Sequence, residues 1–306
     1  MTGAAGLAAG FAAAALQSCS YLVSARYVRE SRRPAWTLLP PAFALMGLGA
    51  IALLPATWPA GGAAAVPWRP ALAAAGLSTL FCLAANAAMF LLLRRVDSSR
   101  ASPLLAAKVP MLAAFYSFGL GRPCTAAQWC GVALVVAAAA LLAGAGRRIS
   151  RSGWGWLLAT CAGYCVADWY IVRTFEAVAP AFPGFAGRSL FSLALIYLVT
   201  GAASLALLPF VPRFPAAEWR RHALPYAALW FLAMVALYGC FAACGLVLGN
   251  IVQSTRGLVS VGLGWLVART GRTDLEERVG AGVVARRVLA ALLLVAAVAL
   301  YAAGGA

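Results

Sequence analysis

Three charged residues lie inside long apolar stretches of this 306-residue sequence, and their chemistry most needs an explanation. They are Lys108, Asp168 and Arg256. A charged group at the centre of a membrane helix costs at least ~2.5–3.5 kcal/mol to insert, and such groups often mark binding sites or proton pathways. The two cations could bind an anionic group such as a carboxylate or a phosphate. The acid could carry a proton.

Each of these charges also has a structural explanation. Lys108 could extend its amine to the membrane surface or pair with a carboxylate, and Arg256 is only about five residues into its segment, so it could reach the surface more easily. Asp168 could form a fixed ion pair with Lys108, Arg173 or Arg256. A functional role for Lys108 is favoured by Pro110, which frees a backbone carbonyl in the same segment.

Neutral polar side chains accompany these charges. Tyr164 precedes Asp168 by four residues and therefore shares its helical face. Residues 250–255 are unusually polar for a membrane segment, and polar backbone at membrane depth is tolerated only where it faces protein or water. Such residues can also serve as contacts between helices. The candidate substrate-binding residues are Lys108, Arg256, Asp168, Gln17, Asn86, Tyr164, Tyr238 and Gln253.

The composition indicates a membrane protein. Hydrophobic residues make up 64% of the chain, charged residues 10%, and the mean hydropathy is +0.88, whereas soluble domains are about 45–50% apolar and about 25% charged. A helix needs roughly 20 apolar residues to cross a bilayer. Ten segments qualify: 3–25, 36–54, 71–93, 101–120, 126–145, 154–172, 189–208, 223–246, 251–267 and 288–303. They are too long and too continuously apolar for barrel strands. The sequence therefore predicts an all-α membrane protein with ten transmembrane helices.

The basic residues follow the order of these segments. The chain has 24 Lys and Arg against 8 Asp and Glu, a net charge of +16. Eighteen of the basic residues fall in odd-numbered loops, 4 in even-numbered loops, and the remaining 2 are Lys108 and Arg256. Such an imbalance predicts that the odd-numbered loops are cytoplasmic and both termini external. Topology thus explains the charge, and nucleic-acid binding is not expected.

Two halves of the chain, residues 1–148 and 149–306, resemble each other weakly. The stretch from Gln17 to Arg26 aligns with that from Tyr164 to Arg173 at an offset of 147, and Lys108 aligns with Arg256 at an offset of 148. Five helices in each half would place the halves in opposite orientations. Inverted repeats are typical of transporters whose substrate site lies near the midplane. We expect two inverted five-helix repeats around a central cavity.

The residues around the fourth segment resemble a known family. Residues 98–105 (SSRASPLL), 119–123 (GLGRP) and 128–132 (QWCGV) are similar to the ten-helix drug/metabolite transporter superfamily, the EamA-type permeases. Arg122 departs from the acidic residue that is usual there, and the second half is more divergent. The resemblance implies export of a metabolite or drug through a central cavity, without enzymatic activity. Family members are usually drawn with cytoplasmic termini, the opposite of what the charges indicate.

Other chemistry finds little support. The eight cysteines include the pairs Cys161/Cys165 and Cys240/Cys244 within apolar segments, where cysteine acts as a small packing residue. The only histidine, His222, is expected to lie in a loop between apolar segments. No metal site, cofactor or catalytic residue is expected. The acid-rich loop 274–277 is the one feature that suits the alternative, a non-transporting membrane protein such as a lipid-modifying enzyme or an assembly partner.

These observations predict a secondary transporter that works by alternating access. It would move a small anionic or zwitterionic metabolite or drug across the bacterial inner membrane, as an exporter. Its partners would be the substrate and the lipid bilayer, with protons as the candidate coupling ion, and it would be a monomer or a homodimer.

Overall fold

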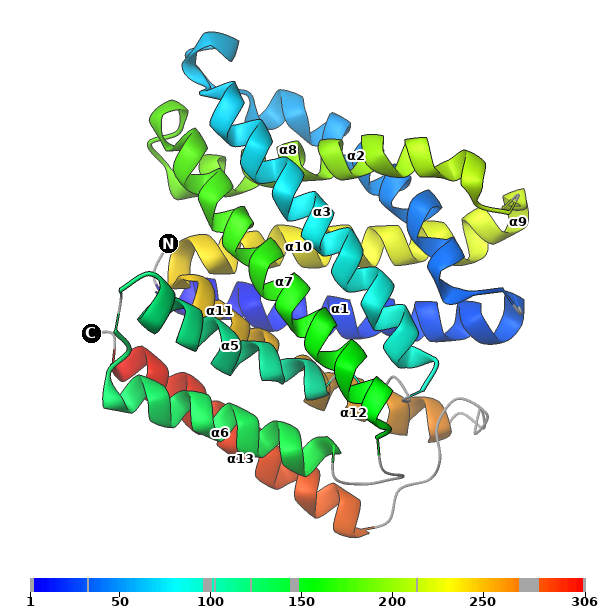
Figure 1. The fold of residues 1–306 in the computed structure, drawn as a ribbon, viewed down its shortest axis with the longest axis vertical. Helices are drawn as coiled ribbons and strands as arrows, with labels where there is room; N and C mark the ends of the chain where they lie inside the picture. Colours follow the sequence, from blue (N-terminus) through cyan, green and yellow to red (C-terminus); the bar gives the residue numbers. More distant parts are fainter. Residues whose placement is uncertain are drawn as a thin grey trace. The chain divides into compact units, whose positions relative to one another are not determined.

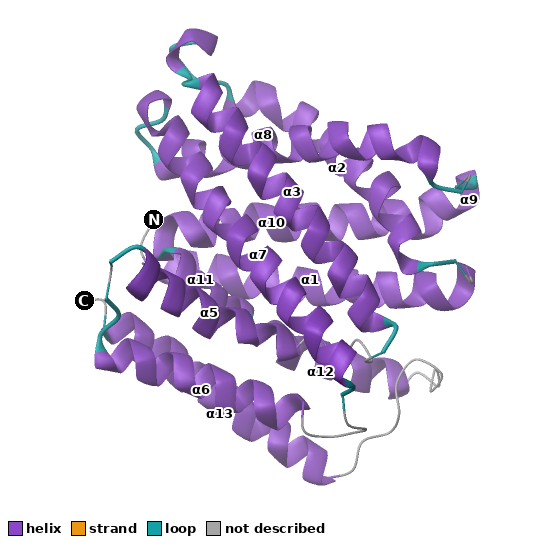
Figure 2. Ribbon diagram, in the orientation of Figure 1, coloured by secondary structure: helices purple, strands orange, loops and turns teal. Residues whose placement is uncertain are grey.

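A computed structural model describes residues 3–31, 33–95, 101, 103–121, 123–143, 149–212, 214–269 and 281–304. Within these residues all regular structure is helical (Figure 2). Five helices are long and apolar enough to cross a membrane: Gly3–Ser24, Trp36–Thr57, Trp68–Leu92, Phe185–Phe210 and Ala216–Cys244. The all-helical membrane class is therefore confirmed, while ten spanning helices in two repeats stay a prediction. Arg122, most of the turn at 98–102 and the acid-rich loop 274–277 lie outside the described residues.

The chain forms two compact units, and each takes segments from both halves of the sequence. The first unit comprises residues 1–84 and 166–246, and the second comprises residues 85–165 and 247–306. The boundary between them falls within α3 (Trp68–Leu93) and α7 (Arg151–Val178). Compact units and sequence repeats are different divisions of a chain, so the repeat boundary at residue 148 stays a prediction.

The first unit is built on two helix pairs. α1 (Gly3–Ser31) packs against α10 (Leu224–Cys244), and α2 (Leu39–Thr57) packs against α8 (Phe185–Leu207) (Figure 1). Gly47 and Gly201 bring the backbones of α2 and α8 into contact, because a Cβ on Gly47 would lie 2.8 Å from the Cα of Gly201. Small residues permit this close approach, which gives membrane helices much of their packing energy.

The second unit contains α5 (Lys108–Ala114), α6 (Ala126–Ala143), α12 (Arg256–Arg269), α13 (Ala281–Ala303) and nearly all of α11 (Leu246–Gln253). α6 packs against α13 (Figure 1). Gly131 makes this pairing close, since a Cβ there would lie 2.9 Å from the carbonyl oxygen of Ala297.

Two of the predicted segments are interrupted, and each predicted cation begins a helix after the interruption. A 3-10 turn at Leu105–Ala107 precedes Lys108, and α11 ends at Gln253, three residues before Arg256. At the second break, the Ser254 hydroxyl donates to the Asn250 carbonyl oxygen (2.9 Å), and the Thr255 hydroxyl donates to that of Val252 (2.7 Å). The same two carbonyl oxygens also accept the backbone N–H groups of Ser254 (3.0 Å) and Thr255 (3.0 Å), so the hydroxyls add second hydrogen bonds at the turn between α11 and α12.

α3 contacts α7 within each unit. In the first unit, the Ser78 hydroxyl donates to the Ala167 carbonyl oxygen (3.1 Å), and the rings of Phe81 and Tyr170 stack with centroids 6.4 Å apart. In the second unit, the Tyr164 hydroxyl donates to the side-chain oxygen of Asn86 (3.1 Å). This pairing positions the polar residues of both helices.

Candidate functional site

All eight candidate residues are buried, with at most 8% of each residue exposed. They divide between the two units. Lys108, Arg256, Asn86, Tyr164 and Gln253 belong to the second unit, whereas Gln17, Asp168 and Tyr238 belong to the first. The structure therefore presents two sets of polar residues, each held by its own unit.

Lys108 is the centre of the set in the second unit. Its amine donates a hydrogen bond to the side-chain oxygen of Gln253 (2.8 Å), and the same nitrogen lies 5.8 Å from the centroid of the Tyr164 ring. An ammonium over an aromatic face is attracted by the ring quadrupole, more strongly when it is shielded from water. Lys108 is 4% exposed, so its amine does not extend to the surface of the chain.

Tyr164 joins this lysine to a second polar side chain. Its ring faces the Lys108 amine, while its hydroxyl donates to Asn86 on α3. The thiol of Cys165 donates to the backbone oxygen of Lys108 (3.4 Å). We call Lys108, Gln253, Tyr164 and Asn86 the Lys108 cluster. It brings four of the eight predicted residues into one connected group.

Arg256 shares the surroundings of this cluster. It is 3% exposed, begins α12 and lies close enough to Cys161 for an electrostatic interaction, as does Lys108. Next to it, Gly257 packs against Pro103, where an added Cβ would lie 3.2 Å from the proline Cα. The two cations predicted from the repeat offset therefore both lie near the same cysteine of α7.

The three candidates of the first unit are buried among its helices. Asp168 (6% exposed) interacts electrostatically with Tyr238 (2% exposed), and the Tyr238 ring meets that of Phe175 edge-on at 5.7 Å. Gln17 is 3% exposed on α1. Arg173, one of the proposed partners of Asp168, forms an exposed ion pair with Glu176 (2.7 Å).

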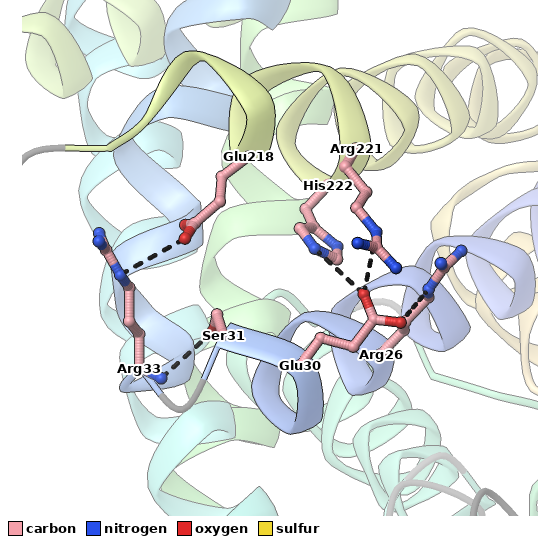
Figure 3. Close-up of polar contacts among 7 residues, drawn as sticks. All are labelled: Arg26, Glu30, Ser31, Arg33, Glu218, Arg221 and His222. Carbon is pink, nitrogen blue, oxygen red and sulfur yellow. Dashed lines mark hydrogen bonds and ion pairs between the residues drawn. The ribbon is translucent and has the colours of Figure 1, made fainter.

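A second charged group was not anticipated from the sequence. Figure 3 shows Glu30 at the end of α1 with three cationic or basic neighbours. Its carboxylate meets Arg26 Nε at 2.7 Å, Arg221 Nε at 3.1 Å and His222 Nε2 at 3.5 Å. We call these four residues the Glu30 cluster. Beside it, Arg33 lies 3.7 Å from Glu218.

The Glu30 cluster joins the residues after the first predicted segment to those before the eighth. The alternation of basic loops requires that loops one and seven lie at the same end of the helices, and these contacts agree with it. Which side of the membrane they face stays a prediction. The hydrogen bond from Arg26 and the neighbouring positive charges lower the pKa of Glu30 below its ordinary value.

His222 corrects an expectation. It lies not in a loop but in a helical turn, Trp219–Ala223, that continues into α10, and it is 3% exposed. Its ring also meets that of Tyr27 edge-on at 5.4 Å.

The Glu30 cluster could have been predicted from Glu30 itself. This residue is an acid within an Arg-rich loop, and such an acid tends to pair with the basic residues around it.

Metal chemistry gains no support from the side chains. Within the described ranges, no group of three or more His, Cys, Asp or Glu residues could hold a metal ion. Cys161 and Cys165 are free thiols, buried in α7.

The fold and its buried cation define the class: a multi-pass helical membrane protein. The comparisons refine it. Residues 4–144, just under half of the chain, match the model of the EamA-like transporter family. The resemblance inferred from residues 98–132 is thus confirmed.

One protein of known crystal structure is 18% identical in sequence to this chain. The match covers 97% of both chains with a TM-score of 0.66. At this identity it shows the fold alone. No curated protein matches the sequence.

Proposed function

We propose that this protein is a secondary transporter that moves a small anionic or zwitterionic compound by alternating access, in the direction of export from the bacterial cytoplasm. The observation that carries the proposal is the Lys108 cluster. An ammonium at membrane depth costs at least ~2.5–3.5 kcal/mol, and here its position is defined by a hydrogen bond to the Gln253 side-chain oxygen and by the face of the Tyr164 ring. Such a cation is suited to binding a carboxylate or a phosphate.

The helix contacts support the inverted repeat on which alternating access would depend. An inversion that exchanges helix one with six and three with eight converts the α1–α10 contact into the α7–α3 contact, and both occur. The same inversion maps the α2–α8 and α6–α13 contacts onto themselves, and these are the closest glycine pairings described above. Lys108 and Arg256, equivalent under the offset of 148, follow a 3-10 turn and a two-residue turn between helices respectively, and irregular helices are a feature of transporter substrate sites.

Proteoliposomes provide the test. Purified protein is screened for uptake of amino acids, organic acids and cationic drugs, with and without a pH gradient. We expect flux of an anionic or zwitterionic compound, and a loss of about tenfold or more in Lys108→Met, because one charge-assisted contact contributes about 1.5–3 kcal/mol. The matched control is Arg173→Gln, which removes an exposed, ion-paired cation and leaves flux unchanged.

Two results would contradict the proposal. One is the absence of protein-dependent flux for every compound class. The other is full activity of Lys108→Met toward an anion, which would remove the proposed role of this lysine. Protons as the coupling ion are tested separately: Asp168→Asn is expected to retain substrate binding but to lose its response to the pH gradient.

A further inference from the structure

The charged end of the first unit carries more positive than negative charge. Arg26, Arg33, Arg220 and Arg221 contribute four positive charges, while Glu30 and Glu218 contribute two negative charges. Glu30 is shared between two arginines, one on each carboxylate oxygen. With His222 neutral, these six described side chains alone carry a net charge of +2, so they can accept a further anion.

Donors for such an anion are present. Arg26 and Arg221 both contact Glu30 through Nε, and the terminal nitrogens of both guanidinium groups have no ion pair with any other described residue. These side chains are 38% and 59% exposed, and Arg220, the residue before Arg221, is also exposed. Figure 3 shows both guanidinium groups next to the Glu30 carboxylate. The planar guanidinium matches the oxygens of a phosphate in a bidentate manner.

The position of these arginines along their helices indicates that the phosphate belongs to a lipid. The apolar span of α1 ends at Ser24, two residues before Arg26. On the other helix, Leu224 follows Arg221 by three residues and is 51% exposed, as a lipid-facing side chain would be. The guanidinium groups therefore lie where apolar helix surface gives way to polar residues. Lipid phosphates occupy this level of a bilayer, where basic residues attract anionic lipids.

We infer that Arg26, Arg220 and Arg221 bind the phosphate headgroup of an anionic phospholipid, in competition with the Glu30 carboxylate for the guanidinium groups. The acyl chains of the lipid would lie along the apolar surface that begins at Leu224. This site is independent of the substrate site and of the direction of transport.

The test uses the full-length protein purified in detergent. Phosphatidylglycerol, phosphatidylcholine and inorganic phosphate are added in turn, and binding is followed by native mass spectrometry and by the melting temperature. We expect phosphatidylglycerol to bind and stabilise the protein more than phosphatidylcholine does. Arg221→Gln is expected to weaken phosphatidylglycerol binding about fivefold, the effect of losing one basic residue near an anionic surface. Arg173→Gln is the control and binds as the wild type does.

Glu30→Gln gives the sharper result. It removes the carboxylate that competes with the lipid phosphate, so phosphatidylglycerol is expected to bind more tightly and to raise the melting temperature by a larger amount than in the wild type. This variant also decides the question if Arg221→Gln does not fold. Equal binding of the two lipids, wild-type affinity in Arg221→Gln, or equal stabilisation by inorganic phosphate would each overturn the inference.

Discussion

The Lys108 cluster and the Glu30 cluster handle positive charge in opposite ways. Glu30 and its arginines are 35–59% exposed and meet as opposite charges, so water and salt screen them and each pair contributes little. Lys108 is 4% exposed and is held by an amide oxygen and an aromatic ring. The difference teaches that one cluster joins helix ends through exposed ion pairs, while the other holds a buried cation against an amide oxygen and an aromatic ring in a low-dielectric setting.

Gln253→Leu is the strongest way to test this contrast. It removes the hydrogen-bond acceptor of a buried ammonium, and the free energy of unfolding is expected to fall by about 2 kcal/mol, because bonds to charged groups contribute about 1.5–3 kcal/mol. Denaturant unfolding in detergent measures the change. The matched control is Gln128→Leu, which loses an acceptor for the Thr125 amide (2.9 Å) near the surface. Equal losses in the two variants would break the comparison.

Tyr164 separates the two contributions of one side chain. Tyr164→Phe keeps the ring over Lys108 but loses the hydroxyl bond to Asn86, so we expect a loss of about 1 kcal/mol. Tyr164→Leu also loses the cation–π contact and is expected to cost a further ~0.5–2 kcal/mol. If the ring stabilises the protein through its contact with the Lys108 charge, Tyr164→Phe and Tyr164→Leu are expected to have equal free energies of unfolding in a Lys108→Met background.

Arg221→Gln tests the Glu30 cluster, the exposed one of the two clusters compared. The Arg221–Glu30 pair is exposed, so its removal is expected to lower the free energy of unfolding by less than about 1 kcal/mol. High salt is expected to erase this difference. Denaturation at low and high ionic strength measures both values. A loss as large as that of Gln253→Leu, insensitive to salt, would show that the Glu30 cluster is not merely a surface network.

The smallest effect is a pH dependence. Because the pKa of Glu30 is lowered in the folded protein, its ion pairs contribute fully above the ordinary glutamate pKa and lose their contribution as the pH falls through the folded value. The melting temperatures of the wild type and Glu30→Gln are therefore expected to differ near neutral pH and to converge in acid. Convergence as the pH is raised would contradict this sign.

The sequence predicts the class and the ionisable members of the site. Lys108, Arg256 and Asp168 are identifiable because charge inside an apolar run is costly, and Gln253 because its neighbours are polar. The bond between Lys108 and Gln253 spans 145 residues, so it depends on which helices pack together, which periodicity alone does not specify. The division into two compact units, each with segments from both halves of the chain, could not be predicted from the sequence for the same reason.

His222 illustrates a different limit. Arg220, Arg221 and His222 interrupt the apolar run, so the sequence indicates a loop, yet the backbone there continues as a helical turn into α10. Helix formation is local, whereas the burial of His222 depends on Tyr27 and Glu30 of another helix. Hydropathy locates the membrane segments well and their polar ends poorly.

The contact between Gly47 and Gly201 has a consequence for how freely this protein can vary. A Cβ at either position would lie 2.7–2.8 Å from the other glycine's Cα, with backbone rather than a movable side chain in the way. In a comprehensive substitution library selected for correctly inserted protein, these two positions should retain glycine while the lipid-facing Leu48 beside them (61% exposed) accepts many apolar residues. Two adjacent positions on one helix would then mark the most and the least constrained faces of α2.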